Sequence, residues 1–467
     1  MSVAAQSERA PARARSGSLT RALAWLLALV LVLATAEIVL DGALGHSPLI
    51  PKSPPIAGWL TNPFGVGARI GERLGYRTFL VAILVFAVAY GGLLALTRRG
   101  GRTVIARRPA LILIAALHAI VFIGPILLST DVFSYIAYAR MGVEHGLNPY
   151  LHGPSAIAHD PVYPYVGHDW LHVATAYGPI YTLLSYPLAP LGLEGALWAM
   201  KLEAVLASAG TLALTWRCAR VRGLDPVWAV VAVGANPLYV IYGVGGAHND
   251  LIMMLAMMAA VSLTLAAGPS SSAGEPSLAP ARRSWRREAG AAAIVVAGAL
   301  VKATVAVLLP FMIIARRRLA PVLGALAALA LGALVGYAAF GVHGIDVVAA
   351  LNRDAAFVST DSFATEIAHL FGKPGVFPID HDLLKALLVL IAAHLLWRTW
   401  RGYDWVAAAG WTLLAISVTS TWLLAWYILW PLPLAVMSRD RRLLAATLGL
   451  QALFILHQIS PLLAPVQ

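Results

Sequence analysis

The sequence predicts an all-α fold, a polytopic bundle of transmembrane helices with large loops outside the membrane. Of the 467 residues, 60% are hydrophobic and only 12% are charged, about half the charged fraction of an ordinary soluble domain. Apolar runs of about 17 to 25 residues recur, and each is long enough to cross a bilayer as a helix. Arginines fill the short segments between these runs, as in cytoplasmic loops. A soluble fold is therefore excluded, and the net charge of +12 does not indicate nucleic-acid binding.

The N-terminal elements alternate between the two sides of the membrane. Residues 1–21 carry four arginines among Ser and Ala and are expected to form a disordered cytoplasmic tail. Residues 22–460 are expected to form a single transmembrane domain. Its first spans are predicted over 22–43, 78–97 and 109–128. The first and third spans run outward, and the second returns to a cluster of arginines.

A large folded outer loop is predicted for residues 129–194. This stretch holds acidic residues and five histidines but few hydrophobic runs. Its last part, 177–192, is apolar but contains three prolines. Counting 177–192 as a span would place the arginines that follow residue 216 outside the membrane. We therefore expect a helix that lies at the membrane interface or re-enters it.

The middle of the chain contains a predicted break at Lys302. Further spans are predicted over 195–216, 226–243 and 250–267. The Ser-, Pro- and Gly-rich segment 268–288 ends in arginines and is expected to be a mobile cytoplasmic linker. The apolar stretch 289–315 has arginines at both ends, so both ends belong inside. Two short helices that meet near Lys302 satisfy this condition.

The C-terminal part is predicted to contain five spans and a second outer loop. The loop covers 341–382 and carries charges of both signs. The spans are predicted over 319–340, 383–400, 404–421, 423–437 and 442–458. The predicted topology therefore has about thirteen spans, with the N-terminus in the cytoplasm.

Asp131 directly follows the third predicted span. A carboxylate at the membrane surface beside aromatic residues is placed to meet a lipid-borne substrate, and as a general base it would accept a proton from an attacking hydroxyl. Tyr135 and Arg140 follow at helical spacing and are expected near it. The alternative role is an N-cap for the next helix, which Thr130 or Asp131 would suit equally well.

His248, Asn249 and Asp250 cluster at the outer end of the span predicted over 226–243. Two glycines precede them and permit a close backbone approach. Such a cluster could hold the hydroxyls of a sugar, a phosphate or a metal ion. The alternative is a polar turn that only joins two spans.

Lys302 lies between two apolar half-helices. A cation at this depth is costly unless it faces a cavity or a partner. One role is that of a phosphate ligand, and the alternative is a structural ion pair with a carboxylate of the bundle.

No metal site and no cofactor are predicted. The histidines of the first outer loop form no compact ligand pattern such as H-E-x-x-H. They are His145, His152, His159, His168 and His172. The aromatic cluster around Trp426 is typical of an interfacial belt, with stacking against a sugar as the alternative.

Five segments carry a resemblance to a known family. They are DVFSYIAYARMGVEHGLNPY (131–150), AYGPIY (176–181), NPLYVIYGVGGAHND (236–250), VKAT (301–304) and WYILWPLPL (426–434). Their order and spacing resemble those of the GT-C glycosyltransferases, and within them the polyprenol-phosphate-mannose-dependent alpha-1,6-mannosyltransferases of actinobacterial lipomannan synthesis.

The resemblance implies an outward-facing site and a donor whose prenyl tail lies in the membrane. It implies that Asp131 is catalytic, that the segment 248–250 faces the site, and that Lys302 suits the donor phosphate. Tyr177 and Trp426, from two other matching segments, join the predicted binding residues. The loop 361–382 and the first forty residues match nothing in the family, so the resemblance does not identify the acceptor.

The function expected from these residues is an inverting transfer of mannose. A hydroxyl of a lipid-linked glycan attacks the sugar of polyprenyl-phosphate mannose, and Asp131 accepts its proton. Lys302, with Arg140 or an arginine of the second outer loop, stabilises the leaving phosphate. The expected partners are this donor, the acceptor and membrane lipids. The alternatives are a transporter or flippase of lipid-linked sugars, which also has buried charges and broken helices, and a transferase of another sugar.

Overall fold

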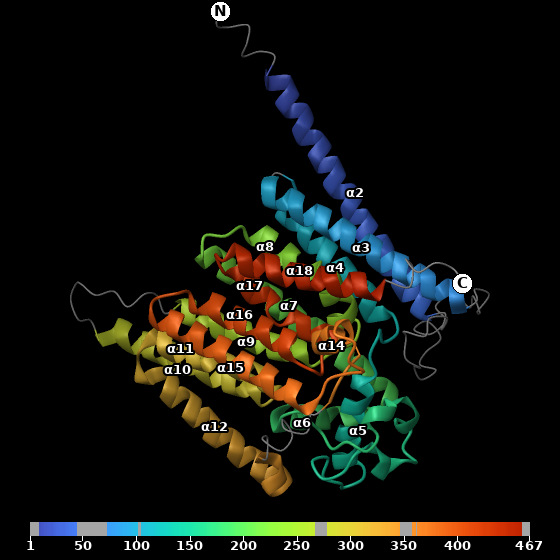
Figure 1. The fold of residues 1–467 in the computed structure, drawn as a ribbon, viewed down its shortest axis with the longest axis vertical. Helices are drawn as coiled ribbons and strands as arrows, with labels where there is room; N and C mark the ends of the chain where they lie inside the picture. The colour runs from blue at the N-terminus through green and yellow to red at the C-terminus, as the bar shows by residue number, and fades with distance from the viewer. Residues whose placement is uncertain are drawn as a thin grey trace, which may run out of the picture.

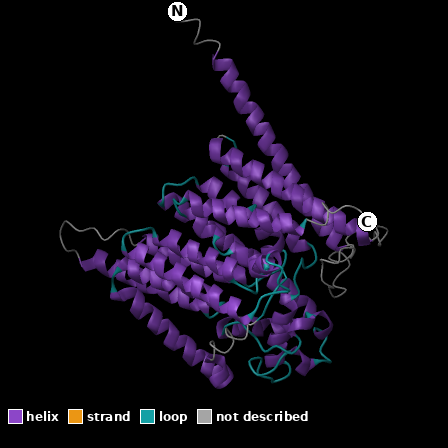
Figure 2. Ribbon diagram, viewed as in Figure 1, coloured by secondary structure: helices purple, strands orange, loops and turns teal. Residues whose placement is uncertain are grey.

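The computed structural model describes residues 9–43, 72–100, 104–266, 278–345, 357–360 and 362–459. Within these ranges the chain forms α-helices, short 3-10 and π-type helices and loops, and no strand (Figure 2). The predicted all-α class is therefore confirmed. Residues 268–277 of the predicted linker, and residues 346–356 and 361 of the predicted second outer loop, lie outside the described residues.

In the first half of the chain, α5 and its loops form a lobe at one end of the helix bundle (Figure 1). The α-helices of this half are α2 (Arg9–Ala43), α3 (Glu72–Gly100), α4 (Arg107–Ile123), α5 (Asp131–Val143), α6 (Pro179–Ser185), α7 (Gly192–Val221), α8 (Pro226–Gly234) and α9 (Asp250–Ala266).

The second half packs beside α7 and α9 and completes the bundle. Its α-helices are α10 (Leu278–Ala299), α11 (Leu308–Arg316), α12 (Leu319–Phe340), α14 (Phe363–Leu370), α15 (Pro378–Trp400), α16 (Trp405–Thr419), α17 (Leu432–Met437) and α18 (Arg441–Gln458).

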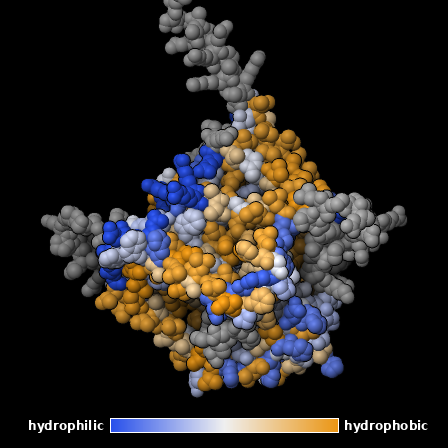
Figure 3. Space-filling view, viewed as in Figure 1, coloured by the Kyte–Doolittle hydropathy of each residue, from blue (hydrophilic) through white to orange (hydrophobic). Residues whose placement is uncertain are grey.

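Several helical segments are long and apolar enough to cross a membrane. They are Ser18–Ala43, Arg77–Arg98, Pro179–Val221 and Leu319–Ile345, and shorter apolar helices accompany them. Helix α12 carries exposed leucines along its length, from Leu319 to Leu334, which suits contact with lipid. Figure 3 shows mostly hydrophobic residues between two hydrophilic regions, one near α8 and α17 and one around α5. These features indicate a multi-pass membrane protein, while the number of spans and their orientation stay predictions.

Two predicted boundaries were wrong. Helix α2 begins at Arg9, within the tail expected to be disordered, and α10 begins at Leu278, within the expected linker. Both segments are rich in Ala and Arg, which have high helix propensity. Each extends a hydrophobic helix, so propagation costs less than starting a new helix.

The span predicted over 226–243 is broken. Helix α8 ends at Gly234, and a π-type turn, Tyr239–Val244, follows. Pro237 lacks the backbone N–H that a continuous helix needs, and the side-chain oxygen of Asn236 accepts a hydrogen bond from the backbone N–H of Tyr239 at 3.1 Å. The break redirects the chain toward the turn that carries His248 and Asp250.

The predicted break near Lys302 is confirmed. Helix α10 ends at Ala299, and Lys302 is extended before a 3-10 turn, Ala303–Val307, that leads into α11. The apolar segment 177–192 contains α6 and a 3-10 stretch, Tyr186–Leu191, which runs directly into α7. Its interfacial position stays a prediction.

Candidate functional site

Asp131 and His248 meet where the start of α5 faces the turn before α9. The Oδ2 atom of Asp131 lies 3.5 Å from Nδ1 of His248. Thr130 occupies the N-cap position of α5 and makes no side-chain cap hydrogen bond. Asp131 is the first residue of the helix, so the N-cap role considered for it does not apply to this geometry.

Burial controls the acidity of Asp131. Desolvation raises the pKa of Asp131 to about 6, with the charge of Lys302 opposing this rise and the charge of Asp250 adding to it. Asp131 lies in the lobe that follows the end of α4 and belongs to none of the predicted spans. A carboxylate with this pKa is mostly ionised at neutral pH and is more basic than an exposed aspartate, which suits a general base.

His248 is fully buried and stacks on Trp426. The ring centroids are 3.7 Å apart with an interplanar angle of 24°. Burial lowers the pKa of His248 well below its usual value, and the charge of Lys302 lowers it further. The imidazole is therefore neutral beside Asp131. A Cβ at Gly246 would lie 2.7 Å from the His248 ring, so this position requires glycine. The close backbone approach expected from the two glycines before His248 is therefore present.

Lys302 forms an ion pair with Asp250. The Nζ atom of Lys302 lies 2.8 Å from one carboxylate oxygen of Asp250, and Trp430 Nε1 donates to the other at 2.6 Å. The ammonium also lies over the rings of Tyr427 and Trp430, 4.6 Å and 5.4 Å from their centroids. The structural ion pair considered for Lys302 is thus present. The Lys302 side chain keeps 15% exposure, against 1% for Asp250, so it lies at the edge of the buried network.

Tyr135 and Tyr177 join the same cluster. The hydroxyl of Tyr135 donates to the side-chain oxygen of Asn249 at 3.4 Å. Its ring meets those of Tyr177 and Tyr181 edge to face, with centroids 4.9 Å and 5.2 Å apart. These contacts connect α5, the segment before α6 and the turn before α9.

Arg140 is not brought to this cluster. Its Nε donates to Asp160 at 2.9 Å, and His145 approaches the same carboxylate at 2.8 Å. Burial by itself raises the pKa of Asp160, but the hydrogen bonds from Arg140 and His145 outweigh it and hold the pKa below its usual value. Nine residues along a helix correspond to two and a half turns, so Arg140 faces away from Asp131. The expected proximity of Arg140 to Asp131 was therefore wrong.

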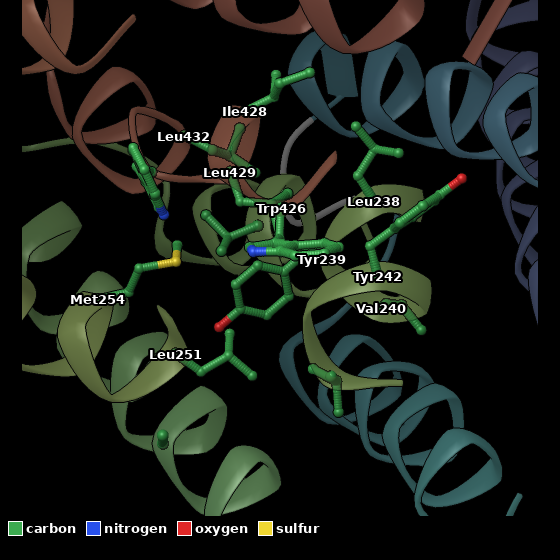
Figure 4. Packing of buried hydrophobic residues seen from close by; sticks show 14 of the residues in the cluster. Leu238, Tyr239, Val240, Tyr242, Leu251, Met254, Trp426, Ile428, Leu429 and Leu432 are labelled. Carbon is green, nitrogen blue, oxygen red and sulfur yellow. The ribbon is translucent and has the colours of Figure 1, made fainter. Parts of the chain in front are cut away.

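The aromatic cluster is not a lipid-facing belt at Trp426 and Trp430. These side chains are 6% and 3% exposed, and they pack against His248 and Asp250 instead. Figure 4 shows Trp426 among buried hydrophobic residues of the segments 238–242 and 428–432. The sequence pattern could not separate a belt from a buried cluster, because both consist of closely spaced aromatic residues near a span end.

Several buried polar atoms of the cluster have no hydrogen-bond partner among the described residues. They are both ring nitrogens of His248, Nδ2 of Asn249 and Nε1 of Trp426. Unpaired buried polar atoms are costly and are uncommon in folded proteins. These atoms are concentrated at His248, which lies next to Asp131, and at residues adjoining His248.

Two residues that the sequence analysis did not single out hold this site in place. Gly178 packs against the break before Lys302: its N–H donates to the carbonyl of Val301 at 3.2 Å, and a Cβ would clash with the carbonyl of Leu300. Lys201 of α7 donates to the carbonyls of Gly124 and, at 3.2 Å, of Val121, where α4 ends. The glycine inside AYGPIY was the available signal for the first contact.

Comparison with known families decides the assignment. The family description "Alpha-(1->6)-mannopyranosyltransferase, N-terminal domain" matches residues 26–318, a range that contains Asp131, His248 and Lys302. The chain belongs to the alpha-(1->6)-mannopyranosyltransferase family. The description "MptB C-terminal domain" matches residues 382–461, where Trp426 and Trp430 lie. The enzyme is therefore a mannosyltransferase, as the sequence predicted.

Individual members of the family are similar over different lengths. The chain is 27% identical over 419 residues to alpha-(1->6)-mannopyranosyltransferase A of Mycobacterium tuberculosis, which covers 81% of this chain and 75% of the relative. It is 29% identical over 204 residues to alpha-(1->6)-mannopyranosyltransferase A of Corynebacterium glutamicum, covering 43% of this chain and 37% of the relative. No solved structure matches the chain.

Proposed function

We propose that this mannosyltransferase takes mannose from a polyprenyl-phosphate donor and transfers it, with inversion, to a lipid-linked glycan on the outer face of the membrane. The product is an alpha-mannosidic linkage to the 6-hydroxyl of the acceptor. The observation that carries the proposal is the meeting of Asp131, His248 and the Lys302–Asp250 pair in one buried cluster.

Asp131 is the general base of this reaction. A 6-hydroxyl of the acceptor attacks the anomeric carbon of the donor, so a bond forms between the acceptor oxygen and that carbon. The bond from the carbon to the phosphate oxygen breaks, and its electron pair leaves with the phosphate. The proton of the hydroxyl passes to Asp131, whose pKa of about 6 keeps it ionised at neutral pH.

Lys302 stabilises the charge that develops on the leaving phosphate. Its ammonium group lies at the edge of the cluster and is pre-oriented by Asp250. Because Trp430 also donates to Asp250, that carboxylate keeps a partner when Lys302 turns toward a phosphate. A fixed cation in a site of low polarity is worth more than the same charge in water.

The unpaired donors bind the sugar. Asn249 Nδ2 and Trp426 Nε1 are buried without partners beside Asp131, and sugar hydroxyls would satisfy them. The neutral His248 can accept or donate one hydrogen bond through each ring nitrogen. Tyr135 and Tyr177 line the same region with aromatic edges.

The membrane position follows from the distribution of charge. Arginines lie near the ends of α3 and α15 and in the first half of α10, whereas the lobe between α4 and α7 holds five of the eight histidines of residues 1–266 and few arginines. Positive residues favour the cytoplasmic side, so the lobe and Asp131 belong outside. A prenyl donor would then enter from the outer leaflet.

The test is transfer by the purified enzyme in lipid nanodiscs. Radiolabelled polyprenyl-phosphate mannose is supplied with extracted acceptor lipids, and a parallel reaction receives a mannose sugar nucleotide. We expect label in a product that an alpha-1,6-specific mannosidase releases, and only with the lipid donor. Transfer from the sugar nucleotide alone would refute the proposal.

A further inference from the structure

A second site lies between α3, α8 and α18 (Figure 1), and none of its lining residues belongs to the cluster around Asp131. A cavity of about 770 Å³ opens there. Most of its walls are apolar, including Leu94, Leu448 and Ile455. Its two cations are Arg98, in the last turn of α3, and Arg441, the first residue of α18.

Both arginines are available to a ligand. Their side chains are exposed, and neither forms an ion pair with a carboxylate within the described part of the chain. They also line an adjoining cavity of about 480 Å³, together with Trp228 and Leu444. The two hollows therefore share one cationic mouth.

A buried donor points to a ligand at this mouth. The Nε1 atom of Trp228 is buried and has no hydrogen-bond partner among the described residues, although Trp228 lines both cavities. An indole N–H needs an acceptor when water is excluded. A phosphate oxygen held by Arg98 and Arg441 would supply one.

The other polar groups near the cavity already have partners. Tyr90 donates to the carbonyl of Ala232 at 2.6 Å, and Asn236 donates to Gln451 at 2.8 Å. Beyond the mouth, the cavity therefore offers mainly hydrocarbon. A ligand that fits has an anionic head and an apolar tail.

Two carboxylates line the smaller cavity, and both serve as helix N-caps. Asp225 accepts from the backbone N–H of Val227 at 2.8 Å, and Asp440 accepts from that of Arg442 at 2.8 Å. Asp440 also accepts from Trp411 Nε1 at 3.0 Å. Neither carboxylate lines the larger cavity, so they reduce the positive potential at the mouth without occupying its arginines.

We propose that this cavity binds an anionic phospholipid from the leaflet on the arginine-rich side of the membrane. The phosphate lies between Arg98 and Arg441, and one acyl chain follows the apolar wall toward Ile455. Basic pockets between membrane helices on the cytoplasmic side recognise such headgroups. The site is separate from the proposed transfer reaction and does not depend on it.

The first test is lipid retention measured by native mass spectrometry. The purified protein is titrated with phosphatidylglycerol or phosphatidylcholine, and Arg98→Ala/Arg441→Ala is compared with the matched double variant Arg108→Ala/Arg401→Ala. The control removes two exposed arginines that do not line this cavity. We expect wild type and control to prefer phosphatidylglycerol and the Arg98→Ala/Arg441→Ala variant to bind it about tenfold more weakly. Equal binding by both double variants would overturn the proposal.

The second test separates a lipid from free phosphate. Leu448→Trp fills the apolar part and leaves both arginines in place, so it should also reduce phosphatidylglycerol retention. Inorganic phosphate at millimolar concentration should not displace the lipid. Displacement by phosphate, or normal retention by a folded Leu448→Trp protein, would contradict an acyl chain in the cavity. Thermal unfolding of each variant verifies that it is folded.

Discussion

Lys302 forms a 2.8 Å ion pair with Asp250 across the junction between a broken helix and the turn before α9. The second oxygen of Asp250 accepts a hydrogen bond from Trp430. The pair therefore connects three segments of the chain. It makes Lys302 a structural cation, and in the proposed reaction the same ammonium group would also meet the donor phosphate at the edge of the cluster.

Replacing Lys302 separates these two roles. Lys302→Met leaves Asp250 buried without its cation and is expected to lower the free energy of unfolding by about 3 to 5 kcal/mol. The double variant Lys302→Met/Asp250→Asn removes both charges and should recover most of that stability. It should still use the donor poorly, with a higher KM and a lower kcat. Wild-type donor kinetics in the double variant would show that Lys302 acts only through its ion pair.

Gly178 sets the position of the break before Lys302. In Gly178→Ala the new Cβ meets the carbonyl of Leu300, so the segment before Lys302 must move. A shift of about 1 Å at a catalytic group can reduce activity about a hundredfold, and we expect a loss of that order in kcat/KM. Gly290→Ala is the matched control, because no atom lies within 4 Å of its added Cβ. Equal activity of the two variants would remove Gly178 from the account.

The pH profile reports the ionisation of Asp131. The pKa of Asp131 is raised to about 6 by burial, and a base works only when deprotonated. The rate constant kcat/KM should therefore be constant above that pH and should fall tenfold per pH unit below it. His248 is held neutral by its lowered pKa and should add no step in this range. A flat profile down to pH 5 would exclude Asp131 as the titrating base.

Topology is measured independently of activity. Reporter fusions after residue 160 and after residue 365 should report the outer side, and a fusion near residue 275 the cytoplasm, because arginines cluster around that segment. Phosphatase and fluorescent-protein reporters give opposite signals and serve as each other's control. An outer signal near residue 275 would invert the membrane placement of the site.

The helical class and the grouping of most site residues could be predicted from sequence. Apolar runs of this length predict helices, because a backbone N–H or C=O group without a hydrogen bond is costly in lipid. The arginines at both ends of 289–315 predict the break near Lys302. The motifs containing Asp131 and His248 were expected to share a site, and the structure places these side chains 3.5 Å apart.

The remaining features depend on contacts between distant segments. The fit of Gly178 against Leu300 and the burial of Trp430 on Asp250 arise only when α6, α10 and the segment before α17 pack together. Arg140 was misplaced because spacing was considered without the direction of each side chain around α5. The break at Asn236–Pro237 was missed because the span was assigned from its apolar length, without weighing the turn signal of the Asn-Pro dipeptide.

The most direct test of the account is the transfer rate of Asp131→Asn. The amide keeps the shape of the carboxylate but cannot act as the proton acceptor, so the rate should fall by about a hundredfold to ten-thousandfold. Expression and thermal unfolding should match wild type, and Glu144→Gln, an exposed acid just after α5, should retain full activity. A folded Asp131→Asn enzyme that transfers mannose within about threefold of wild type, far outside the range for a lost base, would contradict the central claim.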